Sequence, residues 1–208
     1  MGTVKSLLLG MCFVVGACTS QTSTVQTTEK GTQWEWQNGT IVVKTPERPA
    51  GQKSVLGLTT PKLEAVRVGF VGLGMRGPGA VERFTYIPGT QVVALCDYEE
   101  ARADKCQELL KKASMPKAAV YSGDKGYEEL CKRDDIDLVY IAADWLHHFP
   151  VAKCALENGK NVAIEVPSAM NLQECWDLIN LSESTRKHCF ILENCCYDWF
   201  EMNTLNKI

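Results

Sequence analysis

Apolar and polar positions alternate along most of the chain with two different periods. Short apolar runs rich in β-branched residues predict six strands, and longer amphipathic stretches between them predict helices. This alternation favours an α/β fold, a doubly wound parallel sheet with helices on both faces. The predicted strands are 66–71, 90–96, 119–121, 138–142, 161–165 and 189–192, and the predicted helices are 78–86, 99–114, 127–133, 150–158 and 172–186.

Two of these helices have recognisable start signals. Pro150 suits the first turn of a helix, where its missing N–H has no helical partner in any case. Asn171, followed three residues later by Glu174, predicts an N-cap with a capping-box partner. We therefore expect helices to begin at these two positions.

The first 17 residues predict an export signal. An apolar run over residues 6–17 follows Lys5, and it is too short to span a bilayer as a stable helix. The small residues before Cys18 resemble a bacterial lipobox, so we expect Cys18 to be lipidated. The alternative is a plain signal peptide cut near Ala17, with a periplasmic product. The chain has no twin-Arg pair, which favours the general secretory route.

A polar segment separates this signal from the predicted domain. Residues 19–29 are mostly Ser, Thr and Gln, so residues 18–60 are interpreted as a lipidated Cys followed by a flexible tether. Within it, an Asn38-Gly39 turn predicts a short strand over residues 39–43. Trp34 and Trp36 alternate with polar residues, and we expect them to dock on the domain surface.

Charge and cysteine usage exclude some classes of function. The 208 residues include 22 Lys and Arg against 25 Asp and Glu, a net charge of −3, which argues against a nucleic-acid partner. Ten cysteines are present, but none form a CxxC pair, so a zinc site has little support. Cys96, Cys154 and Cys189 occupy apolar positions and are expected in the core. For Cys195 and Cys196 we expect crowded packing, with reactive thiols as the alternative.

A phosphate-binding turn follows the first predicted strand. Residues 72–77 read GLGMRG, which is GxGxxG, and Asp97 lies twenty residues after Gly77 at the end of the second strand. In this context Gly72 permits a tight turn, Gly74 lets the backbone approach a pyrophosphate, and Gly77 lets helix and strand pack closely. Asp97 would accept hydrogen bonds from a ribose diol and repel a 2′-phosphate, which favours NAD over NADP. Arg76 is either a phosphate or adenine contact or a solvated surface charge.

Three further groups follow later strands and are expected at the same sheet edge. Residues 143–148 contain Trp145, His147 and His148, residues 165–167 read Glu-Val-Pro, and residues 193–197 contain Asn194. Ligands of doubly wound sheets bind beyond the carboxyl ends of the strands, so these groups predict a nicotinamide and substrate pocket. His147 is interpreted as a surface residue at a helix start, His148 as a site residue, and Glu165 as a site residue or an isolated salt-bridge partner.

Together these residues resemble the family of glucose–fructose oxidoreductases and inositol dehydrogenases (Gfo/Idh/MocA), whose strand-five motif is usually Glu-Lys-Pro. Here Val166 replaces the lysine that assists proton transfer in that family, and valine exchanges no proton. From about Val55 to Asn206 the chain resembles one branch, glycoside hydrolase family 109, the NAD-dependent α-N-acetylgalactosaminidases. The resemblance implies an NAD-binding Rossmann domain over residues 61–196. It also implies cofactor contacts by Met75, Arg76, Asp97, Trp145, His148, Glu165, Val166 and Asn194, beside the glycines Gly72, Gly74 and Gly77.

The resemblance also implies a mechanism and a substrate. The family transiently oxidises a sugar with NAD⁺, eliminates the aglycone, adds water and returns the hydride, so the expected substrate is a glycan with a terminal N-acetylgalactosamine. Such a redox-neutral reaction suits an exported protein that meets no NAD pool. The alternatives are a sugar or cyclitol oxidoreductase with a net redox product and a non-catalytic lipoprotein that binds NAD or glycan.

Family members continue with a second, α+β domain that supplies most sugar contacts. Residues 197–208 are interpreted as its start, and the remainder is expected to be missing from this chain. The catalytic residues are expected mainly in that domain. We therefore expect the chain to bind NAD weakly and to hydrolyse little.

Overall fold

The computed structural model describes residues 26–27, 33–44 and 46–206 of the chain, which divides into two units, residues 1–44 and 45–208. The predicted signal peptide and the predicted lipidation site Cys18 lie outside the described residues. Within the described residues, no helix combines the length and apolar character needed to cross a membrane.

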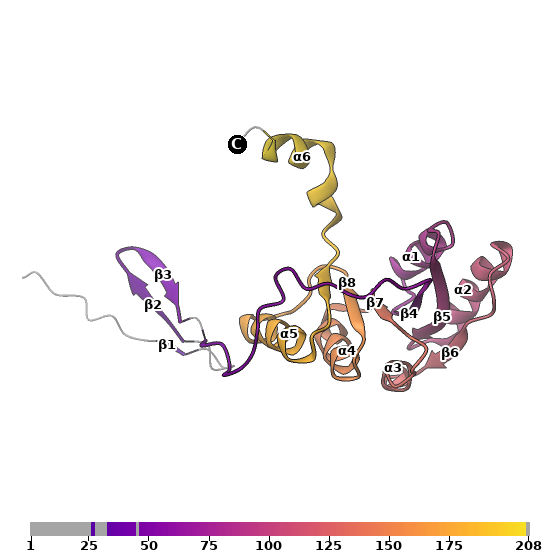
Figure 1. Ribbon diagram of the computed structural model, residues 1–208, viewed down its shortest axis with the longest axis horizontal. Coiled ribbons are helices and arrows are strands. Elements are labelled where there is room, and N and C mark those ends of the chain that lie inside the picture. The colour runs from indigo at the N-terminus through magenta and orange to yellow at the C-terminus, as the bar shows by residue number, and fades with distance from the viewer. Residues whose placement is uncertain (1–25, 28–32, 45, 207–208) are drawn as a thin grey trace, which may run out of the picture. The chain divides into compact units, whose positions relative to one another are not determined.

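The first unit contains a small antiparallel sheet (indigo in Figure 1). Strands β2 (Gln33–Gln37) and β3 (Thr40–Val43) form a hairpin, and β1 (Gln26–Thr27) pairs with β2 on its other side. Asn38 and Gly39 both have positive φ, 50° and 78°, as a two-residue hairpin turn with right-handed strand twist requires. The predicted strand after this turn is confirmed. Docking of Trp34 and Trp36 on the domain stays a prediction.

The second unit is built on a six-stranded parallel sheet, ordered β6-β5-β4-β7-β8-β9. The chain therefore starts in the middle of the sheet, builds outward to one edge, and returns to build toward the other. This is the strand order of dinucleotide-binding doubly wound folds, and it confirms the predicted fold class. The strands are β4 (Val66–Val71), β5 (Thr90–Asp97), β6 (Ala119–Ser122), β7 (Leu138–Ile141), β8 (Asn161–Ile164) and β9 (Cys189–Ile191).

Helices cover both faces of this sheet (Figure 1), which explains why its central strands read as apolar runs. Successive residues of one strand enter opposite layers: Phe70 packs in the layer of α1 and α2, and Val71 in the layer of α3, α4 and α5. The helices are α1 (Gly77–Phe84), α2 (Glu100–Lys112), α3 (Gly126–Cys131), α4 (Trp145–Glu157), α5 (Leu172–Thr185) and α6 (Trp199–Leu205), with a 3₁₀ turn η1 (Asn194–Tyr197) before the last.

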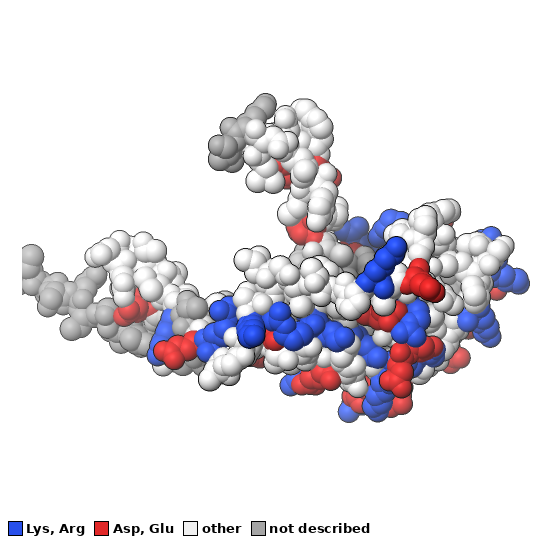
Figure 2. Space-filling view, viewed as in Figure 1, with Lys and Arg blue, Asp and Glu red and all other residues white. Residues whose placement is uncertain are grey.

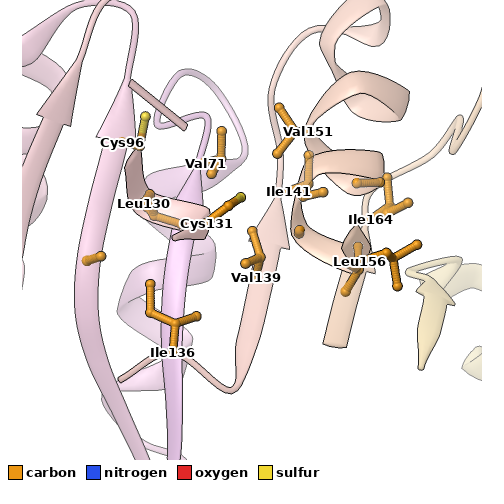
Figure 3. Close-up of a cluster of buried hydrophobic side chains, with 14 of the residues drawn as sticks. Val71, Cys96, Leu130, Cys131, Ile136, Val139, Ile141, Val151, Leu156 and Ile164 are labelled. Carbon is orange, nitrogen blue, oxygen red and sulfur yellow. The ribbon is translucent and has the colours of Figure 1, made fainter. Parts of the chain in front are cut away.

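The core layer between the sheet and helices α3 to α5 is a cluster of buried apolar side chains (Figure 3). It joins Val139 and Ile141 of β7 to Leu130 of α3 and Leu156 of α4, all of them fully buried. Cys96 is buried in this layer, and the partly buried Cys154 and Cys189 pack against it, as predicted. Burying such side chains stabilises the fold by about 1.5–3 kcal/mol each, so this layer fixes the helices relative to the strand ends.

Two sequence predictions are wrong in detail. Helix α4 begins at Trp145, five residues before the predicted start at Pro150, because the Asp144 carboxylate accepts the Leu146 N–H (3.0 Å) and caps the helix. Pro150 stands in the second turn. Cys195 and Cys196 are exposed, as is every residue of η1, the turn that carries them. The Asn171 cap of α5 is confirmed: its side chain accepts the Glu174 N–H at 3.1 Å.

Part of the segment interpreted as a tether contacts the domain. Arg48 forms a two-pronged ion pair with the buried carboxylate of Glu183 on α5, with N···O distances of 2.9 and 3.0 Å. Gln52 donates to the Asn180 carbonyl, and Arg186 donates to the Lys53 carbonyl. These contacts attach residues 48–53 to the end of α5.

Charged side chains of both signs are interspersed on the face drawn in Figure 2. Short-range ion pairs also form along the helices, such as Lys132 with Glu129 at the end of α3 (2.6 Å) and Lys111 with Glu108 on α2 (3.9 Å). Exposed pairs of this kind stabilise little.

Candidate functional site

A cleft of about 520 Å³ opens at the carboxyl ends of β4, β5, β7 and β8. It lies where β4 and β7 are neighbours although two βα units separate them in sequence, which is the point where doubly wound sheets bind ligands. Its walls are Val71, Gly72, Gly74, Met75, Arg76, Cys96, Asp97, Tyr98, Arg102, Gly123, Asp124, Tyr127, Ala142, Ala143, Asp144, Trp145, His147, His148, Val151, Glu165 and Val166.

Two glycines of the turn after β4 are required by the protein's own backbone. Gly72 has φ +91°, and a Cβ there would lie 2.3 Å from the Ala143 nitrogen at the end of β7. A Cβ on Gly77 would lie 2.1 Å from the Gly72 carbonyl oxygen. The backbone alone therefore excludes a side chain at both positions, whether or not a ligand is bound.

Gly74 is different, because a Cβ there would make only an ordinary van der Waals contact. The nearest atom to a Cβ there is Nη1 of Arg102 at 3.6 Å, and its φ lies outside the left-handed region. The residue next to the helix, Arg76, is the N-cap of α1 and makes no side-chain capping bond. Pro78 has no N–H, so the other N–H groups of the first turn of α1 and the positive end of its dipole remain for an anionic group. The space beside Gly74 would be filled by a methyl group, and it lies next to a helix start that no side chain caps. This arrangement fits a dinucleotide pyrophosphate.

The Asp97 carboxylate joins the turn to the end of β5. It is 6% exposed, and its Oδ2 accepts the Leu73 N–H at 2.6 Å. Its Oδ1 accepts the Glu99 N–H at 3.0 Å and lies 3.3 Å from Nη1 of Arg102. With one donor on Oδ2 and two on Oδ1, the carboxylate retains acceptor capacity mainly on Oδ2. Asp97 therefore holds the turn in place and still offers an acceptor for a ribose hydroxyl.

Glu165 stands at the end of β8, and its buried partner is Tyr140. The Tyr140 hydroxyl donates to Glu165 Oε1 at 2.8 Å. Burial, reinforced by this hydrogen bond and the carboxylate charge, raises the pKa of Tyr140 to about 12, although Arg83 acts in the opposite direction. Tyr140 therefore stays a donor throughout the physiological pH range, and it orients the carboxylate toward the cleft.

His148 ties two walls of the cleft together. Its side chain is 1% exposed, with Nδ1 2.7 Å from the Pro167 carbonyl oxygen and Nε2 2.9 Å from that of Ala143. The ring thus links the first turn of α4 to the segments after β7 and β8. This geometry makes His148 a positioning residue as well as part of the wall.

The rim of the cleft carries exposed side chains from the predicted site. Met75 is 95% exposed, Trp145 60% and Val166 39%, so all three are accessible to a ligand. Beside them, His147 Nδ1 lies 2.6 Å from Asp144 Oδ2. Burial opposes ionisation of Asp144, but His147 and the capping N–H groups outweigh it and lower its pKa. His147 is a helix-start residue, as predicted, and it also lines the cleft.

Nine of the eleven residues predicted to bind the cofactor line this cleft, and Gly77 and Asn194 do not. Gly77 affects the cleft indirectly, because it packs against Gly72. Asn194 is an exposed residue at the start of η1. The cofactor roles of all eleven remain predictions. The sequence analysis missed Tyr98, Arg102, Asp124 and Tyr127, which enter the cleft from the segments that follow β5 and β6.

No group of three or more His, Cys, Asp or Glu side chains in the described part of the chain is arranged to hold a metal ion. The donors of the cleft are instead spread around a glycine-rich turn. Their arrangement fits an organic cofactor with an anionic centre.

Comparisons with known proteins agree with this geometry. Residues 66–192 match the family described as "Oxidoreductase family, NAD-binding Rossmann fold". Glycosyl hydrolase family 109 protein 4 of Phocaeicola vulgatus is 81% identical over 207 residues, 99% of this chain and 40% of the relative. Glycosyl hydrolase family 109 protein 1 of Bacteroides thetaiotaomicron is 57% identical over 204 residues, 98% of this chain and 42% of the relative. The chain thus spans about two fifths of the length of these relatives.

Solved structures share the fold. Myo-inositol dehydrogenase from Lactobacillus casei, solved with NAD(H) and myo-inositol, matches with a TM-score of 0.61 and 23% identity, covering 69% of this chain and 41% of that one. Biliverdin reductase from Synechocystis, solved with biliverdin and NADP⁺, matches with a TM-score of 0.57 and 25% identity, covering 69% and 43%.

Proposed function

Because the chain belongs to the oxidoreductase family with an NAD-binding Rossmann fold, we propose that it is the cofactor-binding part of a redox-neutral, NAD-dependent glycosidase. The proposed substrate is a glycan with a terminal α-linked N-acetylgalactosamine. The identity of 81% to a glycosyl hydrolase family 109 protein supports the glycosidase assignment. The whole enzyme's activity would require groups beyond those that the cleft contains.

One observation carries the proposal: a chain that is 81% identical to a glycosyl hydrolase family 109 protein keeps an intact dinucleotide turn, in a cleft where Val166 replaces the lysine expected of related dehydrogenases. NAD⁺, when bound, supplies an oxidant that takes a hydride from the sugar and returns it. The chain's own residues would bind the cofactor and orient it. The α1 N-terminus and the space over Gly74 receive the pyrophosphate, and Asp97 Oδ2 accepts a ribose hydroxyl.

The proposal assigns the nicotinamide end of the cleft to Glu165, Val166 and His148. Tyr140 holds the Glu165 carboxylate by its hydroxyl, and His148 fixes the Pro167 segment that follows Val166. Val166 presents an exposed apolar side chain to the cleft and exchanges no proton. Oxidation of a sugar hydroxyl, transient or net, releases a proton that Val166 cannot accept, so another group must accept it. The redox-neutral assignment is therefore supported by the identity to glycosyl hydrolase family 109 proteins.

The test uses an aryl α-N-acetylgalactosaminide with NAD⁺, recording aryl release and NADH absorbance together. It is run on the 208-residue chain and on the same chain extended with the C-terminal segment of the 81%-identical relative. Aryl release by the extended protein without NADH accumulation is the expected result. NADH accumulation would instead establish a net oxidoreductase. NAD binding with neither aryl release nor NADH accumulation would establish a non-catalytic binding protein.

We also propose that the protein is exported and anchored through a lipid on Cys18. The apolar run over residues 6–17 and the small residues before Cys18 support this. Expression with radiolabelled palmitate would label the wild-type chain and leave Cys18→Ala unlabelled. Equal labelling of both chains would show that Cys18 does not carry the lipid.

A further inference from the structure

The segment that precedes the parallel sheet is fastened to the domain at both of its ends. Near its start, the Arg48 guanidinium donates to the Glu183 carboxylate from Nε at 2.9 Å and from Nη2 at 3.0 Å. Near its end, Thr60 Oγ1 lies 3.0 Å from Nε2 of His188. Residues 48–60, here called the strap, are therefore held against the C-terminal end of α5 and the residue before β9.

The Glu183 carboxylate lies where a free negative charge is strongly disfavoured. It is 4% exposed, and it stands in the last turn of α5, where the negative end of the helix dipole repels it. A buried charge that loses its partner destabilises a fold severely. Arg48 supplies that partner from 135 positions earlier in the sequence, and its own side chain is 54% exposed. The buried member of the pair thus belongs to the domain, and the exposed member is carried by the strap.

Arg186 fastens the strap a second time, from a strained position. It caps the C-terminus of α5 with φ 55°, in the left-handed region that favours glycine. Its Nη1 donates to the carbonyls of Lys53 and Ser54, at 2.6 and 3.0 Å. These hydrogen bonds help to offset the cost of the backbone conformation, so the strap and the end of α5 stabilise each other.

The strap docks at the edge of the sheet opposite the cofactor cleft. Glu165 and Val166 follow β8 and line the cleft, and α5 begins a few residues later. The helix runs back along the sheet, because Cys189 of β9, just after it, pairs with Val162 near the start of β8. With 14 residues α5 is about 21 Å long, so its end lies far from the cleft. In Figure 1 the strap runs from α5 toward the start of β4.

We propose that the strap is a latch that holds α5 and β9 closed against the rest of the sheet. β9 is the edge strand of the described sheet, it contains three residues, and its Phe190 and Ile191 are 49% and 58% exposed. When the strap undocks, Glu183 loses its partner and the end of α5 is freed, so α5 and β9 open together as one local unit. This opening leaves β4 and β5 intact, since they lie beyond β8 and β7.

The latch also fixes where the preceding part of the chain joins the domain. That point is the edge of the sheet opposite the cleft. A lipid anchor on Cys18, as proposed above, would therefore hold the domain by the side away from the cofactor cleft. This consequence depends on the proposed anchor, whereas the latch itself does not.

Hydrogen exchange of the purified 208-residue chain, followed by mass spectrometry, tests the latch. Arg48→Ala should speed amide exchange in α5 and β9 by at least ~10-fold, while β4 and β5 keep the protection of the wild type. Arg48→Lys keeps the charge but loses the two-pronged geometry, so it should restore part of the protection. The matched control is Lys132→Ala, which removes an exposed ion pair with Glu129 (2.6 Å) and should leave α5 and β9 unchanged.

Two further variants test the latch without an unpaired buried charge. Arg186→Gly suits the left-handed cap and leaves the Arg48 pair in place, but it removes the donor to the strap carbonyls. It should fold and yet expose the bond after Lys53 to faster trypsin cleavage. In Arg48→Ala combined with Glu183→Met no carboxylate is left unpaired, so Tm should recover while α5 and β9 still exchange faster than in the wild type.

Four results would each overturn the proposal. Wild-type exchange of α5 and β9 in Arg48→Ala would show that this edge stays closed without the latch. Equal opening in Lys132→Ala would show that any lost ion pair has the same effect. Unchanged cleavage after Lys53 in Arg186→Gly would show that the strap is not fastened there. A return of α5 and β9 to wild-type protection in the double variant would show that Arg48 only neutralises Glu183.

Discussion

The glycine-rich turn allows folding and cofactor binding to be tested separately, through alanine at Gly72 and at Gly74. At Gly72 an alanine meets the Ala143 nitrogen at 2.3 Å and must adopt φ +91°. Left-handed backbone alone costs a non-glycine residue about 1–2 kcal/mol, and the contact adds to it. We therefore expect Gly72→Ala to lose at least ~2 kcal/mol of unfolding free energy.

At Gly74 the same substitution meets only the end of the Arg102 side chain, at 3.6 Å, and needs no unusual φ. Replacing glycine at such a position stabilises a protein by about 0.4–1 kcal/mol, because the unfolded chain loses freedom. The new methyl group nevertheless occupies the space proposed for the pyrophosphate. Gly74→Ala should thus fold at least as well as the wild type and bind NAD⁺ at least ~10-fold more weakly, about 1.4 kcal/mol.

The assay pairs thermal unfolding without ligand with calorimetric titration of NAD⁺. For a chain of this size ~2 kcal/mol corresponds to a fall of roughly 4–8 °C in Tm, so Gly72→Ala should be clearly separated from Gly74→Ala. Unchanged NAD⁺ affinity in Gly74→Ala would refute the placement of the pyrophosphate. An unchanged Tm in Gly72→Ala would refute the turn geometry.

Three further substitutions test the fold and the support of the cleft. The Arg67 hydrogen bond lowers the pKa of Asp137 in the folded protein. The pair therefore stabilises the fold at any pH above the pKa of Asp in the unfolded chain, about 3.9, and this stabilisation is lost as the pH falls through the lower pKa of the folded state. The difference in Tm between the wild type and Asp137→Asn should be large at pH 7 and should disappear as the pH falls below about 4. A difference that does not change with pH would contradict the pairing. Tyr140→Phe should weaken NAD⁺ binding measured by calorimetry and cost ~1 kcal/mol in urea unfolding, since it removes the donor to Glu165, and an unchanged affinity would separate Glu165 from the cofactor. Leu156→Ala should cost about 2–5 kcal/mol in the same unfolding assay, because Leu156 is fully buried, and a cost below 1 kcal/mol would mean that the layer collapses around the gap.

The sheet could be predicted from the sequence because its strands are buried on both faces. Val68 and Phe70 enter one layer and Val71 the other, so the strand reads as one apolar run bounded by Gly72. The strand order does not follow from such runs alone. It required the glycine turn, whose close approach to Ala143 brings β4 and β7 together at the switch point.

The details that the sequence did not reveal depend on competition between local signals and on contacts across the fold. Asp144 and Pro150 are both residues that suit a helix start, and the structure begins the helix at the Asp144 cap. The cost of Pro150 in the second turn is offset by the burial of one face of α4, including Val151 and Leu156. Arg102 lies on the helix after Asp97 with no motif of its own. Only the folded arrangement shows it within reach of the Asp97 carboxylate.

Asp97 and Arg102 together should set the choice between NAD⁺ and NADP⁺. Asp97 would repel a 2′-phosphate, while the guanidinium 3.3 Å from it would attract one once the carboxylate is gone. Asp97→Ala should therefore raise the affinity for NADP⁺ relative to NAD⁺ by ~10-fold or more, and Asp97→Ala combined with Arg102→Ala should not.

Asp97→Ala also removes the acceptor of the Leu73 N–H, so a fall in Tm is expected as well. The ratio of the two dissociation constants, measured on one protein sample, is insensitive to this loss, because an unfolded fraction reduces both apparent affinities equally. A ratio that stays at the wild-type value in Asp97→Ala would show that the ribose does not lie against this carboxylate. An equal rise in the double variant would show that the repulsion by Asp97 acts alone and that Arg102 has no part in the choice.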